Sequence, residues 1–194
     1  KSLGAEIFFE KESANWLPKI NKYFQSSIHN LYIIGDGSGI SGAIPAYEKG
    51  LIAGHTASFD LKFIDEDKFK IITNKIFVKL KKFEKFGKSM AKLMTPSSHI
   101  IKNITKDTIV CRCEDIKREE IEDAIKSGAK EINQLKSWTR CGMGPCQGRT
   151  CEDSIARIIS EHLGDRKSAG IFTRRFPLKP IVMDDAVGEF QYED

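Results

Sequence analysis

The residues with the clearest chemical potential are five cysteines, which all lie between residues 111 and 151. They form a Cys-x-Cys pair, Cys111 and Cys113, and a later group of Cys141, Cys146 and Cys151. Thiolate ligands select zinc, copper(I) or iron–sulfur clusters. In a reducing compartment such a clustered set indicates metal binding or redox chemistry rather than a disulfide framework. We therefore expect a thiolate-bound metal centre in this region.

The spacing and surroundings of the cysteines help to separate these metals. Structural zinc sites usually take cysteines in pairs two to four residues apart, and a Cys-x-Cys pair is less usual there. Both groups are expected at helix starts, where unpaired amides and positive partial charge favour thiolates. The neighbouring sequence adds glycines that let amides approach the sulfurs, and cationic side chains: Gly142, Gly144 and Gly148, and Arg112, Arg140 and Arg149.

The region from Val110 to Gly164 resembles the bacterioferritin-associated-ferredoxin (BFD) type of [2Fe–2S] domain, a small helical module. Its Gly-Met-Gly-x-Cys-Gln-Gly-x-x-Cys stretch resembles the C-terminal module of flavin dehydrogenases acting on amines, opines, hydroxyproline or glycerol 3-phosphate. It departs from the bacterioferritin-associated ferredoxin itself in having four residues, not two, between the last two cysteines. The resemblance implies that Cys141 is left over and that the cluster ligands are Cys111, Cys113, Cys146 and Cys151.

A glycine turn offers a second candidate site. Residues 37–42, Gly-Ser-Gly-Ile-Ser-Gly, satisfy the dinucleotide fingerprint G-x-G-x-x-G between an expected strand and an expected helix. Binding of NAD would also need a second strand ending in an acid, for which Asp60 and Asp65 are the candidates. A plain turn capped by Asp36 is a third interpretation.

The stretch Ile33-Ile34-Gly35-Asp36 also resembles the late strand-Gly-Asp motif of two-dinucleotide flavoproteins. There the aspartate hydrogen-bonds the ribityl chain of FAD, and the following helix N-terminus faces the cofactor. The resemblance implies FAD binding, in the full-length protein, by Gly35, Asp36, Gly37, Ile40, Ser41 and Gly42. The principal pyrophosphate loop of such proteins has no second candidate in this sequence, so we expect a piece of a longer polypeptide that holds FAD poorly by itself.

The elements that would position these residues follow from hydrophobic periodicity. We predict a strand over residues 31–34, a helix over 40–58 and a long lysine-rich amphipathic helix within residues 59–94. In the cysteine region, one helix is expected behind Glu114-Asp115, a short one near residues 132–135, and another from Thr150 toward His162. The long helix would present one face made of Ile72, Ile76, Leu80, Phe83, Gly87, Met90 and Met94.

We therefore predict an α+β, predominantly helical fold, in which the remnant of an FAD-binding α/β domain precedes a small all-α [2Fe–2S] module. The expected boundaries are residues 1–58 for the C-terminal part of the FAD-binding domain and 59–108 for a lysine-rich helical connector. Residues 109–164 would form the [2Fe–2S]-binding domain, and residues 165–194 an extended tail that lies on another surface.

Composition excludes several classes of function. The net charge of +4 comes mostly from lysines in the middle of the chain, which argues against nucleic acid as a partner. We see neither a transmembrane segment nor a signal peptide, and we expect a cytoplasmic protein. The four histidines are isolated from one another, and no Ser-His-Asp or Cys-His grouping supports hydrolase chemistry. No catalytic residue is assigned.

The resemblance implies the electron-transfer module of an FAD-dependent dehydrogenase or oxidase that acts on an amino acid or opine-like secondary amine. Its partners would be the other subunits of a heteromeric flavin dehydrogenase, and substrate oxidation would take place elsewhere. Two alternatives stay open. One is a zinc-stabilised interaction module with the lysine helix as its docking arm, and the other is a stand-alone iron–sulfur electron carrier.

Overall fold

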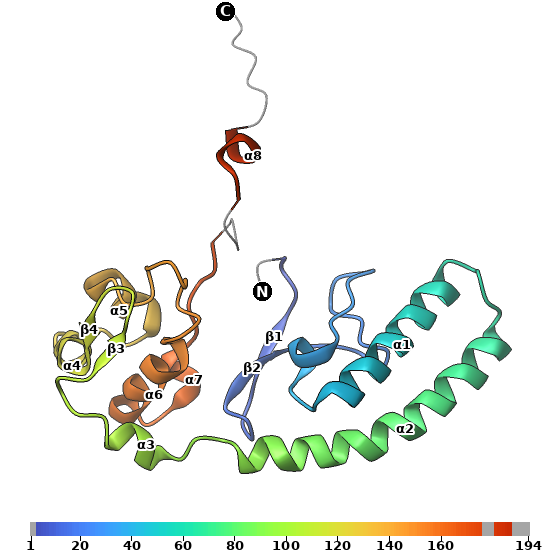
Figure 1. Cartoon of the computed structure of the whole chain (residues 1–194), viewed down its shortest axis with the longest axis horizontal. Coiled ribbons are helices and arrows are strands. Elements are labelled where there is room, and N and C mark those ends of the chain that lie inside the picture. Colours follow the sequence, from blue (N-terminus) through green and yellow to red (C-terminus); the bar gives the residue numbers. More distant parts are fainter. Residues whose placement is uncertain (1–2, 176–180, 188–194) are drawn as a thin grey trace, which may run out of the picture.

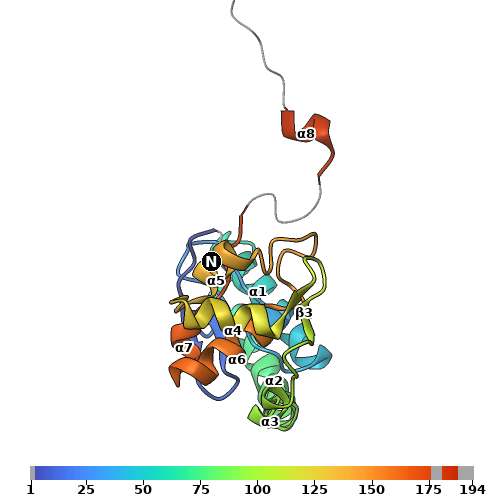
Figure 2. The ribbon, with the colours of Figure 1, turned by 90° about the vertical axis from the view of Figure 1, so that its left-hand side faces the viewer.

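The computed structural model describes residues 3–175 and 181–187, and within these ranges helices predominate over short strands. Figure 1 shows two lobes joined by the long helix α2: an N-terminal lobe with β1, β2 and α1, and a C-terminal lobe with α3 to α7. Figure 2, turned by 90°, places α4, α6 and α7 of the C-terminal lobe toward the viewer. This arrangement confirms the predicted α+β, predominantly helical fold class.

The N-terminal lobe opens with an antiparallel hairpin of β1 (Ile7–Glu10) and β2 (Asn15–Pro18), in which Phe8 lies opposite Leu17. The strand predicted over residues 31–34 is not formed. Tyr32 makes one antiparallel bridge with Gln25, and no described strand continues alongside it. Because a strand needs a neighbour along its length to pair its backbone groups, this apolar stretch remains irregular chain leading into the next turn.

The glycine turn is a short 3-10 helix, η1 (Gly35–Ser38), followed by helix α1 (Ala43–Asp60). Helix α1 confirms the helix predicted over residues 40–58, with a start three residues later. Its N-cap is Gly42, whose φ of 100° is a conformation that a residue with a Cβ rarely adopts. No side chain caps this helix start.

Helix α2 (Glu66–Leu93) runs back along α1 after a turn (Figure 1). Its start is fixed by Asp65, whose carboxylate accepts the backbone N–H of Lys68 at 2.8 Å. Helix α2 confirms the long amphipathic helix predicted within residues 59–94, and residues 59 and 60 end α1. Leu80 is buried as predicted, but the predicted face does not stay buried to its end, because Met94 is 75% exposed.

Two reciprocal ion pairs set α1 against α2. Lys79 of α2 pairs with the buried Glu48 of α1 at 2.5 Å, and the buried Lys49 of α1 pairs with Glu84 of α2 at 3.5 Å. Between the helices lies a small apolar core of Phe24, Ile52 and Leu80. Each helix thus contributes one lysine and one glutamate to the two ion pairs, and these pairs favour one alignment of α1 along α2.

The C-terminal lobe is mostly helical, with one short ribbon of strands that was not predicted. Its elements are α3 (Ser98–Lys102), β3 (Ile109–Cys111), β4 (Ile116–Lys117), α4 (Arg118–Lys126), α5 (Ile132–Thr139), α6 (Glu152–Leu163) and α7 (Arg166–Ala169). Helices α5 and α6 confirm two of the predicted helices. The third starts later than predicted, because Glu114 and Asp115 lie in the turn between β3 and β4.

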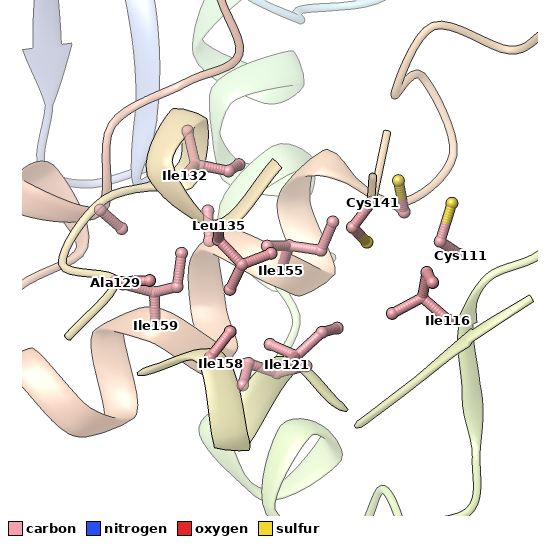
Figure 3. Packing of buried hydrophobic residues seen from close by; sticks show 14 of the residues in the cluster. Cys111, Ile116, Ile121, Ala129, Ile132, Leu135, Cys141, Ile155, Ile158 and Ile159 are labelled. Carbon is pink, nitrogen blue, oxygen red and sulfur yellow. The ribbon is translucent and has the colours of Figure 1, made fainter. Parts of the chain in front are cut away.

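The core of this lobe is an aliphatic cluster dominated by isoleucines, and the cysteines lie at its edge. Ile121, Ile155, Ile158 and Ile159 are fully buried. Figure 3 shows Cys111, Cys141 and Ile116 at one end of the cluster, with Ala129 and Ile159 toward the other end. The two cysteine-bearing loops therefore pack against one end of a single helical core.

The beginning of the predicted extended tail belongs to this core. Helix α7 follows α6, Ala169 is fully buried, and Phe172 is 1% exposed. The tail was predicted to need another surface, and for residues up to about 174 that surface is the cysteine lobe itself. Further along, α8 (Met183–Val187) lies away from both lobes in Figures 1 and 2, while residues 176–180 and 188–194 lie outside the described residues.

None of the helices in the described part of the chain is both long enough and apolar enough to cross a bilayer.

Candidate metal centre and glycine turn

The β3–β4 turn positions the Cys-x-Cys pair. Cys111 ends β3 and is 1% exposed, whereas Cys113 lies in the turn at the surface. The ladder register shifts between Ile109 and Cys111, and Asp115 has a φ of 53°. This bend sends the first cysteine into the core and keeps the second at the rim.

The second cysteine group lies on the loop between α5 and α6. Cys141 is fully buried just after Arg140, which ends α5 in a left-handed conformation. Cys146 follows at intermediate exposure, and Cys151 is buried at the N-cap of α6. The helix-start prediction is therefore met at Cys151, whereas Cys113 lies in a strand turn and not at a helix start.

The loop folds the cysteines of both groups together. The sulfurs of Cys111, Cys141 and Cys151 all lie within 4.8 Å of one another. The thiol of Cys113 is hydrogen-bonded to both the backbone amide and the thiol of Cys146. All five sulfurs thus gather in one region, with three buried and two nearer the surface.

This geometry also changes the interpretation of Cys141. The sequence places it beyond a glycine-rich turn from Cys146, yet its thiol is hydrogen-bonded to those of Cys151 and Cys111. Cys141 therefore lies among the predicted ligands, and its sulfur is close enough to those of Cys111 and Cys151 to be a ligand itself.

Hydrogen bonds at the sulfurs favour thiolates at two positions. The backbone amide of Thr150, with its hydroxyl and the amide of Gly148, lowers the pKa of Cys146 below the ordinary thiol value. The hydrogen bond from Cys141 lowers the pKa of Cys151 to about 7, although burial opposes this. Since the thiolate is the form that binds metals, the loop amides at Cys146 and the Cys141 thiol at Cys151 favour that form.

The other two shifted thiols favour their protonated forms. The hydrogen bond to Cys151 and burial both raise the pKa of Cys141. The amide of Cys146 lowers the pKa of Cys113, but the thiol of Cys146 and neighbouring charge outweigh it, so the net shift is upward. Bound metal ions would reverse this balance, because a metal cation stabilises every thiolate that binds it.

Glycine is required where the loop touches its neighbours. A Cβ on Gly144 would lie 2.2 Å from the Cβ of Cys113, so a larger residue would separate the two cysteine groups. Gly142 and Gly148 both have positive φ, and a Cβ on either would lie 2.5 Å from the ring of Phe172. The glycines noted in the sequence thus serve close packing as well as amide access.

Phe172 is a site residue that the sequence analysis missed. Its ring closes the inner side of the cysteine loop, and its backbone N–H donates to Glu152 Oε1 at 2.9 Å. Arg174 donates to the carbonyl oxygen of Gln147 at 2.7 Å and also pairs with Glu152. No pattern in the sequence marks Phe172, because the apolar residues around it have neither helical nor strand periodicity.

Removal of the Phe172 ring should loosen the cysteine loop. Phe172→Ala is expected to destabilise the C-terminal lobe by about 3–5 kcal/mol, because a fully buried ring leaves a cavity beside two glycines. Denaturant unfolding followed by far-UV circular dichroism measures the change. The control is Phe63→Ala, since Phe63 is 78% exposed. Equal midpoints for the two variants would show that the loop does not depend on this ring.

The glycine turn brings its predicted residues into one exposed segment. Asp36 lies in η1 with its carboxylate at the surface, and no described residue donates a hydrogen bond to that carboxylate. Ile40 is 65% exposed, whereas Ser41 is 7% exposed and faces inward. Gly35, Gly37 and Gly42 provide the bends between them. The carboxylate is therefore free to receive a ligand.

The alternative interpretation as an NAD-binding unit requires a second strand that ends in a free acid, and the structure does not contain it there. Residues 61–65 form a turn instead of a second strand. Asp60 accepts the hydroxyl of Tyr32 at 2.8 Å, and Asp65 caps α2. Both acids that could have contacted a ribose thus have structural partners.

The cysteine pocket fits an iron–sulfur cluster in its donor chemistry. Several convergent thiols, with loop amides at the sulfurs, are the ligands that such clusters use. Residues 109–161 match the model of the BFD-like [2Fe–2S] binding domain family. This region is a BFD-like [2Fe–2S] domain. The match covers both cysteine groups and helices α4 to α6, and it confirms the family resemblance and the cluster expected from the motif.

The whole chain is similar to parts of larger oxidoreductase subunits. It is 33% identical over 182 residues to an opine oxidase subunit of Rhizobium meliloti, covering 92% of this chain and 34% of that protein. It is 30% identical over 165 residues to hydrogen cyanide synthase subunit HcnB of Pseudomonas aeruginosa, covering 83% of this chain and 34% of that protein. The chain thus spans about a third of the length of these curated relatives.

A solved structure shares the fold. The crystal structure of L-proline dehydrogenase from P. horikoshii superposes with a TM-score of 0.68 at 19% identity, over 93% of this chain and 34% of that chain. The likeness extends over both lobes, so the N-terminal lobe, α2 and the BFD-like domain together match one continuous arrangement in a dehydrogenase.

Proposed function

We propose that the chain is the electron-transfer end of an FAD-dependent dehydrogenase or oxidase. The observation that carries this proposal is the gathering of two cysteine groups, Cys111 with Cys141 and Cys151, and Cys113 with Cys146, within a BFD-like domain. Of these five, Cys111, Cys113, Cys146 and Cys151 are the proposed ligands. These four residues would hold the cluster, and a bound [2Fe–2S] cluster supplies one-electron transfer. Cys141 would line the pocket without being a ligand.

The protein's own residues would tune and protect such a site. The amides of Gly148 and Thr150 lie at the sulfur of Cys146, where hydrogen bonds stabilise added negative charge. Phe172 and the buried isoleucines exclude water from the inner side, while Cys113 leaves the outer side at the surface. An exposed side is where an electron can enter or leave.

The N-terminal lobe would serve FAD. Residues 1–58 are proposed as the C-terminal part of an FAD-binding domain, with Gly35, Asp36, Gly37, Ile40, Ser41 and Gly42 at the cofactor. The uncapped N-terminus of α1 offers positive partial charge there, and Asp36 offers an unpaired acceptor. Exposed apolar side chains surround the segment, as expected for a surface covered by a cofactor or by further chain: Ile34, Ile40, Ile44 and Tyr47.

The other residue ranges of the chain have proposed roles that follow from the FAD-binding and cluster-binding lobes. Residues 59–108 would be a helical connector, residues 109–164 the cluster domain, and residues after 164 a tail whose first part is bound to that domain. The substrate would be an amino acid or an opine-like secondary amine, oxidised outside these residues, in a complex with other subunits. The relatives support this substrate class and the presence of other subunits, since one belongs to an opine oxidase and another to a hydrogen cyanide synthase.

Five unpaired cysteines favour a reducing, cytoplasmic location.

Metal and cofactor analysis of anaerobically purified protein tests the proposal. This chain should contain two iron and two sulfide per molecule, and the full-length subunit should contain FAD in addition. Stoichiometric zinc without sulfide would contradict the cluster and favour a zinc-stabilised interaction module. Iron and sulfide without flavin in the full-length subunit would favour a stand-alone electron carrier.

A further inference from the structure

Lys49 is an unusual residue because its ammonium group is buried between two helices. It lies in the middle of α1, and its side chain is 2% exposed. A buried lysine is costly unless its charge is paired and its protons are hydrogen-bonded. The identity of its partners therefore indicates what the residue does.

Most of these partners belong to the segment that precedes α1. Lys49 Nζ donates to Ser38 Oγ at 3.1 Å, to Ser41 Oγ at 3.3 Å and to the carbonyl oxygen of Gly39 at 3.5 Å. Its charge is balanced by Glu84 of α2 at 3.5 Å. One ammonium group thus holds three points of the Gly35–Gly42 segment and joins them to the long helix.

An independent contact brings α2 against the same segment. A Cβ on Gly87 would lie 1.9 Å from the carbonyl oxygen of Ser41, so the helix backbone touches the segment directly. Glu84 and Gly87 are three residues apart and therefore lie on one face of α2. One face of α2 therefore contacts the segment in two ways: Glu84 pairs with Lys49, and the backbone at Gly87 packs against Ser41.

We propose that Lys49 is a positioning residue for the flavin-facing segment, which it holds with the help of Glu84 and Gly87 of α2. The proposal rests on the proposed role of residues 35–42 in FAD binding. A segment with glycine at 35, 37, 39 and 42 loses much conformational entropy when it is ordered. Because Lys49 orders it before the cofactor arrives, less of the binding free energy is lost on ordering.

The test compares Lys49→Met with Lys79→Met. Both variants remove a lysine that joins α1 to α2, but Lys79 pairs with Glu48 and makes no described contact with the segment. In the 194-residue chain, the ¹H–¹⁵N heteronuclear NOE of Gly37, Gly39 and Ser41 should fall in Lys49→Met and stay unchanged in Lys79→Met. In the full-length subunit, Lys49→Met should weaken FAD binding at least tenfold more than Lys79→Met does, with iron and sulfide unchanged.

A merely structural role for Lys49 would lower the melting temperature of both variants and leave the segment's NOE values alike, which would overturn the proposal. Gly87→Ala is a second variant that should disturb the segment, and it does so without removing a charge. It should lower the same NOE values and weaken FAD binding, and an unchanged segment in this variant would also count against the proposal. If the wild-type subunit holds no FAD, the proposed function fails, whereas the NOE comparison still decides whether Lys49 orders the segment.

Discussion

Serine in place of Cys111, Cys113, Cys146 or Cys151 is expected to abolish or strongly reduce the visible absorption of the [2Fe–2S] cluster, whereas Cys141→Ser should retain it. A hydroxyl is a harder and less acidic ligand than a thiol, so it replaces a cluster thiolate poorly. Cys111 and Cys151 are hydrogen-bonded to each other inside the pocket, and Cys113 and Cys146 are hydrogen-bonded at its rim. Each of these contacts joins one cysteine from each sequence group.

Cys141 is the most important variant in this series, because its sulfur is placed to compete for a ligand position. Its sulfur lies within 4.8 Å of those of Cys111 and Cys151, and it is fully buried. Its thiol is hydrogen-bonded to those of Cys151 and Cys111, so it can act as a neighbour that donates a hydrogen bond to a ligand. In that role its loss would shift the absorption or potential of the cluster without removing it.

The measurement is iron and sulfide content together with the visible spectrum of each anaerobically purified variant. Far-UV circular dichroism of each serine variant should match the wild type, which separates ligand loss from unfolding. A colourless Cys141→Ser together with a brown Cys146→Ser would show that the three buried cysteines, with Cys113, form the ligand set. A colourless Cys141→Ser with a brown Cys151→Ser would assign the closer pair, Cys141 and Cys146, instead.

The parts of the structure that the sequence predicted correctly are those marked by local signals. Helix α6 has clear periodicity and a glycine at its end, and α1 is rich in small residues and follows a glycine turn. Both were found within three residues of their predicted starts. The convergence of the two cysteine groups was predicted from residue type and motif. Such signals lie within one element or one loop, and so a single sequence reveals them.

The parts that were missed depend on partners distant in the sequence. Leu31–Ile34 has the composition of a strand, but pairing decides whether a strand forms, and composition carries no information on pairing. Phe172 joins the core through Gly142 and Gly148, whose need for space is visible only in three dimensions. The role of Lys49 depends on Glu84, thirty-five residues away in a helix that is rich in exposed lysines.

Asp36→Ala in the full-length subunit is expected to reduce FAD affinity by ten- to over a hundredfold. The lost interaction is a hydrogen bond to an ionised carboxylate, which is worth about 1.5–3 kcal/mol. The structure makes this a clean substitution, because the side chain is exposed and no described residue is hydrogen-bonded to it. Folding should therefore be unaffected, and any effect should fall on the ligand.

The measurement is the dissociation constant of FAD from flavin fluorescence, after removal and re-addition of the cofactor. Asp36→Asn serves as the matched variant, since it keeps the size and one acceptor oxygen but loses the charge, and it should fall between the wild type and Asp36→Ala. The iron content and the melting temperature should stay at wild-type values in both, because η1 belongs to the N-terminal lobe whereas the cysteines belong to the C-terminal lobe. An unchanged dissociation constant in Asp36→Ala would leave η1 as an ordinary turn and remove the aspartate from the flavin site, whereas a graded loss across the two variants would assign the carboxylate charge itself to FAD binding.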